Sequence, residues 1–376
     1  LQLPIKSDKI IYKSNCPALT TATSGDELTV SSSKVNFVFN KKSGLVTSYK
    51  VDGTEYFKDG FGIQPNFWRA PNDNDYGNGA PKRLQVWKQS SKNFHVTDVN
   101  MTTENKVVLL KATYLLAAGN LYVVTYRIYP SGIVNVSAQF TSTDMQAAET
   151  EVSEATRMAT FTPGSDAARK AASKLEVPRI GVRFRLPAQM NNVQYFGRGP
   201  EENYIDRNHG TLVGVYKTTA DKMYFNYVRP QENGHHTDTR WIALSPDKGN
   251  GLAIVADSLI GFNALRNSIE DFDSEEALPH PYQWNNFSPE EVANHDEKAA
   301  RNVLRRMHHV NDITPRDFVE VCVDMKQQGV GGYDSWGARP EPFHQIPANR
   351  DYSWGFTLVP VRSASQANEV AKYDYQ

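Results

Sequence analysis

Short stretches of alternating apolar and polar residues, separated by turn residues, run through most of the chain. Residues 27–57 and 106–140 have this pattern, with Ser-Gly, Asp-Gly and Gly-Asn pairs between apolar runs, as in antiparallel hairpins. Further strands rich in Val, Ile, Phe and Tyr are predicted at 179–187, 193–199, 239–245, 251–257, 317–328 and 352–361. The pattern predicts an all-β fold with an antiparallel sheet system and few short helices.

Two segments depart from this pattern. Residues 144–174 are rich in Ala, Ser, Thr and charge without a period of two, which predicts an exposed insertion. Ser288, Pro289 and Glu290 carry the signals of a helix start. Because no long Gly/Ser or Pro linker interrupts the chain, we expect one large domain over 27–362. We expect residues 1–26 to be a linker or the end of a preceding domain, and 363–376 to be a polar tail.

Composition narrows the classes of partner. The chain has 41 Lys+Arg against 42 Asp+Glu, so its net charge of -1 does not favour nucleic acid or a charged membrane surface. Aromatic residues make up 11% of the chain, which suits strands and equally suits a surface that stacks on sugars. No run is long and apolar enough to cross a membrane. We expect a soluble protein, cytoplasmic or periplasmic, of open oligomeric state, since Cys16 and Cys322 are too few to indicate a compartment.

Several catalytic signatures are missing from the sequence. It contains no Gly-x-Ser-x-Gly elbow, no His-Glu-x-x-His, no phosphate loop and no dinucleotide fingerprint. The pairs His235-His236 and His308-His309 are adjacent residues, which in an ordinary strand point to opposite faces and so do not chelate one ion. We expect ordinary solvated or hydrogen-bonded histidines; the alternative is a loop conformation that borrows a metal ligand from elsewhere. We therefore expect no metal site in this chain and no cofactor.

Three groups of motifs, taken together, resemble one enzyme family. They are "FWRAPNDNDYGNG" at 67–79, "YFGRGPEENYIDRNHG" at 195–210 with "YVRPQENGHH" at 227–236, and "GVGGYDSWG" at 329–337. In this order they resemble the C-terminal domain, or separate small chain, of β-galactosidases of glycoside hydrolase family 2. The resemblance spans about 27–362. It implies a large antiparallel β-supersandwich, galactose-mutarotase-like, that packs against the family's catalytic (β/α)8 barrel.

The resemblance gives the "GGYDSWG" motif a role in sugar binding. It implies that Trp336 forms an apolar platform for a galactoside, because the C–H face of a pyranose packs on an indole. Gly331 and Gly332 would let the backbone turn, and Asp334 would support the turn. The alternative is that Trp336 is a core residue near a strand end, as tryptophans often are.

The 67–79 motif matches the family's loop near the active site. Its polar side chains could bond sugar hydroxyls, bind a cation or cap their own turns, and Arg69 could pair with an acid in a purely architectural network. The residues concerned are Arg69, Asn72, Asp73, Asn74 and Asp75.

The 195–210 and 227–236 motifs carry many opposite charges. We interpret these as a salt-bridge network that joins loops at one edge of the sandwich, in preference to a catalytic role. The alternative interpretation is that these charged residues form an interdomain contact. The members are Glu201, Glu202, Asp206, Arg207, Arg229 and Glu232.

The resemblance also implies what this chain lacks. The family's catalytic glutamates lie on the barrel, and the one Asn-Glu pair here, Asn368-Glu369, sits in the polar tail. We expect no catalytic residue and no glycosidase activity in this chain alone; the expected partners are the barrel portion, whose family uses a divalent or monovalent cation, and a galactoside substrate. The alternative function is a freestanding sugar-binding or aldose-epimerase-like module.

Overall fold

The computed structural model describes residues 10–11, 16–142, 176–273, 309–332, 334 and 337–374. Within them, twelve strands form one large sheet and five form a smaller sheet. The large sheet contains β7 (Gln64–Asn66), β8 (His95–Glu104), β9 (Val107–Leu115), β10 (Leu121–Ile128), β11 (Val134–Thr141), β12 (Arg179–Pro187), β13 (Asn192–Gly199), β14 (Leu212–Thr219), β15 (His236–Ser245), β16 (Gly251–Leu265), β17 (Phe318–Gln327) and β18 (Tyr352–Val361). The small sheet contains β2 (Thr20–Ser24), β3 (Glu27–Ser31), β4 (Val35–Asn40), β5 (Leu45–Val51) and β6 (Thr54–Glu55).

The helices of the described residues are short. The α-helices are α1 (Asp73–Gly77), α2 (Ala80–Arg83), α3 (Gln85–Lys92), α6 (Ala220–Met223), α7 (Ile269–Phe272) and α9 (Ala367–Val370). Single 3-10 turns are η1 (Lys58–Gly60), η4 (Val310–Asp312), η5 (Pro342–His344) and η6 (Ala364–Gln366). Strands β1 (Ile10–Ile11) and β19 (Tyr373–Asp374) pair in parallel, whereas every pair in the two larger sheets is antiparallel.

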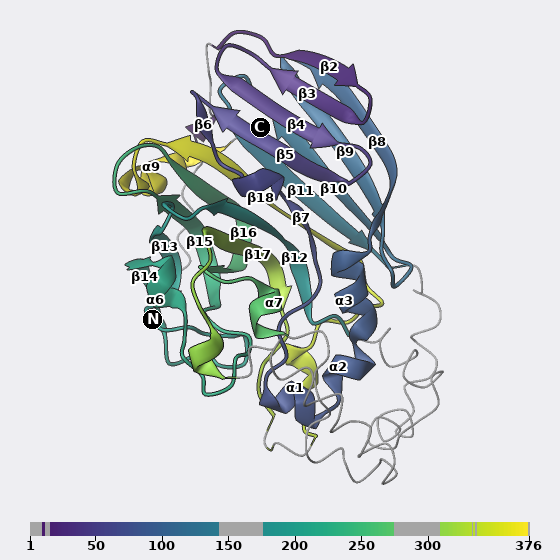
Figure 1. Cartoon of the computed structure of the whole chain (residues 1–376), viewed down its shortest axis with the longest axis vertical. Coiled ribbons are helices and arrows are strands. Elements are labelled where there is room, and N and C mark those ends of the chain that lie inside the picture. The colour runs from purple at the N-terminus through teal and green to yellow at the C-terminus, as the bar shows by residue number, and fades with distance from the viewer. Residues whose placement is uncertain are drawn as a thin grey trace.

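The small sheet packs face to face on one half of the large sheet, as Figure 1 shows for β2–β6 above β8–β11. Strand β4 alternates buried and half-buried residues, so its apolar side chains enter the interface. Phe37 of β4 lies with its ring 5.6 Å from that of Tyr126 on β10. Tyr49 donates its hydroxyl to the carbonyl of Gly132, and Tyr114 donates to that of Gly44, so buried tyrosines join the two layers through backbone groups.

The large sheet continues away from this interface in the order β14-β13-β15-β16-β18-β11-β10-β9-β8. Strand β17 also pairs with β16, and β12 joins β17 to the short β7. This branch places β7, which runs directly into the 67–79 motif, beside β12 and one strand away from β17, which leads into the 329–337 motif. The fold therefore brings the three groups of sequence motifs toward one end of the molecule.

The predicted fold class is confirmed, because the structure consists mainly of antiparallel strands with few short helices. Strand β2 lies within the segment 1–26 that we assigned to a linker or preceding domain, and it pairs with β3. The segment 363–376, predicted as a polar tail, contributes α9, whose Ala367 is buried beside β15 and β16. The predicted insertion at 144–174 and the predicted helix start at 288–290 lie outside the described residues. No described helix is long and apolar enough to cross a membrane.

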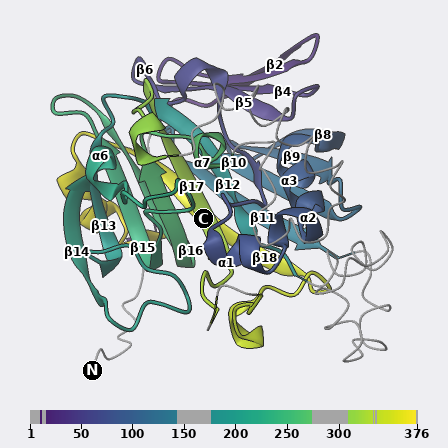
Figure 2. The ribbon, with the colours of Figure 1, turned by 60° about the horizontal axis from the view of Figure 1, so that its bottom comes forward.

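The motif-bearing loops collect at the lower end of the view in Figure 1. Figure 2 brings that end forward and shows α1 there, next to the yellow-green segments that lead into β18. Hydrogen bonds confirm the proximity, since side chains of the 67–79 motif reach the backbone that follows β17. The candidate functional site lies at this end of the molecule.

Candidate functional site

The backbone at residues 328–332, hereafter the stem, lies just before the "YDSWG" part of the last motif. Arg69 is buried against it and donates from Nη1 to the carbonyl of Gln328 at 2.7 Å and from Nη2 to that of Gly329 at 2.9 Å. The same guanidinium donates from Nε and Nη2 to both oxygens of Asp75, at 3.2 and 2.9 Å. Arg69 therefore pairs with an acid, and its remaining donors hold the carbonyl side of the stem.

Helix α1 holds the next residue of the stem. It begins after Asn72, whose side chain accepts from the N–H of Asp75 at 2.8 Å, while Asp75 accepts from the N–H of Asn72 at 3.1 Å. This reciprocal capping box is the self-capping alternative that we left open for the motif. The side-chain amides of Asn72 and Asn74 both donate to the carbonyl of Val330, each at 3.1 Å.

Asp206 contacts the stem from the opposite side. Its Oδ1 accepts from the N–H of Val330 at 3.2 Å and its Oδ2 from the N–H of Gly331 at 2.8 Å. A side chain at Gly329 would lie 2.5 Å from the same Oδ2, so the first glycine of the motif leaves room for this carboxylate. We assigned Asp206 to a salt-bridge network, but the structure pairs it with two backbone amides.

Beyond the stem, the backbone of Gly332 lies beside that of Ala338. A side chain at Gly332 would lie 2.5 Å from the carbonyl oxygen of Ala338, so the two backbones nearly touch there. Asp334 accepts from the N–H of Ala338 at 3.3 Å. The loop between Gly332 and Ala338 is thus closed at its base, and Trp336, which belongs to it, lies outside the described residues.

The other predicted charged residues form separate pairs. Glu202 accepts from Arg207 at 2.7 Å, from the N–H of Gly234 at 2.7 Å and from the hydroxyl of Tyr227. These contacts join the 195–210 motif to the 227–236 motif. The exposed Glu201 contributes its backbone carbonyl, which accepts from Asn203 at 3.0 Å. Among the described residues its side chain forms no ion pair, which differs from the network that we expected.

Arg229 joins the second motif group to α1. It pairs with Asp73 at 3.1 Å, and its guanidinium lies 3.7 Å from the centre of the Tyr76 ring. Four of the predicted loop residues, Arg69, Asn72, Asn74 and Asp75, therefore face the stem or its anchors. Asp73 faces the 227–236 motif instead.

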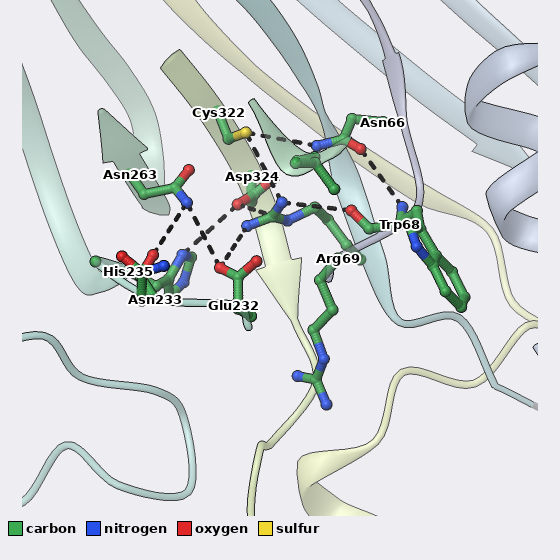
Figure 3. Close-up of polar contacts among 12 residues, drawn as sticks. Asn66, Trp68, Arg69, Glu232, Asn233, His235, Asn263, Cys322 and Asp324 are labelled. Carbon is green, nitrogen blue, oxygen red and sulfur yellow. Dashed lines mark hydrogen bonds and ion pairs between the residues drawn. The ribbon is translucent and has the colours of Figure 1, made fainter. Parts of the chain in front are cut away.

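A second buried polar cluster surrounds Arg179. Figure 3 labels its members Glu232, His235 and Asp324, together with Arg69. The Nε of Arg179 lies 3.2 Å from Asp324, its Nη2 donates to Glu232 at 3.2 Å, and its Nη1 donates to the carbonyl of Trp68 at 3.4 Å. Figure 3 shows the Arg69 side chain extending away from this cluster. Glu232, the last member of our predicted network, is thus part of the core and is not at a sandwich edge.

Two buried carboxyl groups share this one guanidinium. Burial raises the pKa of Asp324 to about 7, against the lowering effect of Arg179 and with a further rise from the neighbouring Glu232. Burial also raises the pKa of Glu232, and burial followed by the charge of Arg179 lowers the pKa of His235 well below its ordinary value.

Sequence reasoning missed most of this cluster. Arg179 and Asp324 stand in the strand segments 179–187 and 317–328, where alternation usually places charged residues toward solvent. His235 is buried and stacks on Tyr204 at 5.4 Å, so the expectation of an ordinary polar histidine did not indicate its position. No group of three or more His, Cys, Asp or Glu side chains suited to a metal ion occurs in the described part of the chain.

Sequence comparison places these motifs in a family. A sequence model described as "Beta galactosidase small chain" matches residues 31–358, and the chain belongs to this family. It is similar to the β-galactosidase of Priestia megaterium, with 31% identity over 361 residues covering 96% of this chain and 29% of that protein. The β-galactosidase of Streptococcus thermophilus is 25% identical over 360 residues, covering 94% and 29%. The chain thus spans less than a third of the length of these relatives.

The chain is also similar to solved structures at low sequence identity. A putative mutarotase from Salmonella typhimurium has a TM-score of 0.39 and 9% identity, covering 94% of this chain and 97% of that one. A galactose mutarotase related enzyme from Lactobacillus acidophilus has a TM-score of 0.41 and 10% identity, covering 90% and 98%. A likeness of this size carries no conclusion about function.

Proposed function

We propose that this chain is the small-chain portion of a β-galactosidase of glycoside hydrolase family 2, and that it completes the galactoside site of a catalytic barrel that lies outside this chain. One observation carries the proposal. Side chains from two motif groups far apart in the sequence, at 67–79 and 195–210, hold the same stem from both sides. That stem leads directly into the loop that contains Trp336.

The physical basis of the proposal is that several buried side chains hold the stem in place. Removing Arg69 and Asp75 from water has a desolvation cost, which a loop with no positional requirement would not need. Side chains that bind a ligand are held best when a second layer of hydrogen bonds fixes their backbone. In our proposal that side chain is Trp336, whose indole face would pack on the C–H face of a galactoside or its aglycone.

The proposal also assigns the bond-breaking step to the barrel. Glycoside hydrolysis needs two carboxyl groups on either side of the scissile bond, at separations of roughly 5 to 10 Å. Asp324 and Glu232 have raised pKa values, but both are buried around Arg179, where a sugar has no access. This chain would therefore supply binding and positioning, and the barrel would supply the acid and the nucleophile, together with any cation.

Complementation tests the proposal. The probe is the Priestia megaterium β-galactosidase without the region that matches this chain. We expect neither piece alone to hydrolyse nitrophenyl β-galactoside and the mixture to do so, with activity that saturates as this chain is added. The heat-denatured chain is the control. The proposal would fail if the native chain restored no more activity than that control, or if the chain alone accelerated the interconversion of galactose anomers, as the epimerase alternative requires.

A further inference from the structure

A cavity of about 320 Å³ lies where β18 ends. Its lining comes from segments far apart in the sequence, namely the β5–β6 turn, the β10–β11 turn, the last residues of β18 and the C-terminal segment that follows. By comparison, the cavities beside Glu232 and beside Arg69 have volumes of about 10 Å³ each, which is about the room that one water molecule needs. The larger cavity has the size of a small-molecule site.

We propose that this cavity binds a small organic anion, with an apolar body on the floor of the cavity and a carboxylate or phosphate group at its rim. The inference goes beyond the proposed function and does not depend on it. None of the lining residues belongs to the motifs at 67–79, 195–210, 227–236 or 329–337.

The floor of the cavity is apolar. Four buried side chains line it, those of Val51, Ile133, Val359 and Val361. Val359 and Val361 are alternate residues of β18, so both point to the same face of the strand, where they pack in one cluster with Ile133. The apolar body of a ligand that contacts these side chains leaves bulk water, which favours binding.

The rim of the cavity carries more positive than negative charge. Lys34 Nζ lies 3.5 Å from Asp52, which is the one acid among the described residues that line the cavity. Arg362 also lines it, is exposed, and forms no ion pair within the part of the chain that the structure describes. A guanidinium binds a carboxylate or a phosphate through two parallel N–H donors, so we assign the anionic group of the ligand to Arg362.

Backbone contacts hold the rim residues in place. Asp52 and Gly53 have positive φ values of 49° and 81° in the two-residue turn between β5 and β6. The N–H of Asp52 donates to the carbonyl of Lys34 at 2.8 Å, which ties these two residues together. At the end of β18, the N–H of Arg362 donates to Gln366 Oε1 at 2.8 Å. The rim backbone is thus ordered before a ligand binds, which lowers the entropic cost of binding.

The hydroxyl of Ser131 adds a polar group to the cavity lining. Its Oγ is buried and has no hydrogen-bond partner among the described residues. A buried hydroxyl without a partner has a free-energy cost, which an oxygen atom of a ligand would remove. A neutral polar ligand would satisfy Ser131 equally well but would make no use of the charge of Arg362. The charge of the ligand is therefore the property that distinguishes the proposed site.

The test titrates the full 376-residue chain with hexanoate, with hexyl phosphate and with the neutral hexanamide. Binding is followed by the NMR shifts of the methyl groups of Ile133, Val359 and Val361. We expect one or both anions to shift these signals saturably, with a Kd roughly tenfold or more below that of hexanamide, because only the anions use the guanidinium. The tighter of the two anions identifies whether the site takes a carboxylate or a phosphate.

Arg362→Gln tests the residue assigned to the anionic group. We expect it to raise the Kd of the anion about tenfold and to leave the Kd of hexanamide unchanged. Lys50→Gln is the matched control, because it also removes one exposed positive charge, from β5. Lys50 precedes Val51 on the strand, so its side chain points to the opposite face, and it does not line the cavity. We expect Lys50→Gln to bind the anion like the unsubstituted chain.

Several outcomes would overturn the inference. They are the absence of a saturable shift with either anion, equal Kd values for the anions and hexanamide, and shifts confined to methyl groups away from the cavity, such as those of Val182 on β12. An unchanged Kd in Arg362→Gln, or equal increases in Arg362→Gln and Lys50→Gln, would show that Arg362 does not anchor the anion and would also overturn it. None of these results bears on complementation of the barrel, so the proposed function is tested separately.

Discussion

Replacing Arg69 with leucine is expected to lower the free energy of unfolding by about 3–5 kcal/mol, as measured by urea denaturation at pH 7. The substitution removes both hydrogen bonds to Asp75 and both bonds to the stem carbonyls. Asp75 would then be a buried carboxylate without its cation, and the carbonyls of Gln328 and Gly329 would lose their donor. The loss should be large because every one of these groups is removed from water.

A matched control lies on the same helix. Arg229→Leu also breaks an ion pair with α1, but the side chains of Arg229 and Asp73 are 37% and 56% exposed, against 2% and 6% for Arg69 and Asp75. We expect Arg229→Leu to cost less than about 1 kcal/mol. Equal losses for the two variants would show that burial of the Arg69 pair does not govern the stability of this end of the molecule.

Replacing Arg179 with methionine is expected to destabilise the fold by a similar amount, about 3–5 kcal/mol at pH 8. Methionine fills much of the space of the arginine stem but supplies no charge to Asp324 and Glu232. Without the cation, the folded-state pKa values of both acids rise further, so the folded variant binds more protons than the folded parent near neutral pH. The difference in stability should therefore grow as pH rises.

The raised pKa of Asp324 predicts the direction in which stability changes with pH. In the parent protein the pKa of Asp324 is about 7 when folded and 3.8 in its ordinary state, so folding takes up a proton between these values and stability falls as pH rises through this window. We expect the Arg179→Met penalty, from urea curves at pH 5 and pH 8, to be smaller at pH 5, where protonated Asp324 needs no cation. A penalty independent of pH would contradict the role assigned to the cluster.

Much of the fold was predictable because its strands are locally regular. The segments 179–187 and 352–361 match β12 and β18 residue for residue. Alternation in these runs has one physical cause, the two faces of a pleated strand. Strands β8 and β14 were not predicted, since β8 is largely exposed and β14 has no buried residue to mark a core face.

The helices and the buried charges were harder to predict. Helix α1 has only five residues, and a capping box specifies where it begins. Its polar composition alone predicts a loop. The Arg179 cluster depends on the pairing of β12 with β17, a long-range contact that no local pattern reveals. Charge alone indicates exposure, and only the tertiary pairing shows that Arg179 is buried.

The site was predictable as a set of motifs but not as a geometry. The motifs identified Arg69 and Asn72 as residues of a possible active-site loop and Asp206 as a member of a salt-bridge network, and the structure gives each a bond to the stem. Their predicted roles were less accurate, because a salt bridge and a hydrogen bond to a backbone amide use the same carboxylate. Which of the two interactions forms depends on whether a cationic side chain or a backbone N–H lies opposite the carboxylate.

The most direct test of the account is a fluorescence titration of the reconstituted β-galactosidase with a galactoside whose glycosidic oxygen is replaced by sulfur to prevent hydrolysis. The account predicts a saturable change in tryptophan emission that is absent when Trp336 is replaced by phenylalanine, with binding weakened in that variant. An identical change in both proteins, with equal affinity, would contradict the claim that this chain completes the sugar site through Trp336.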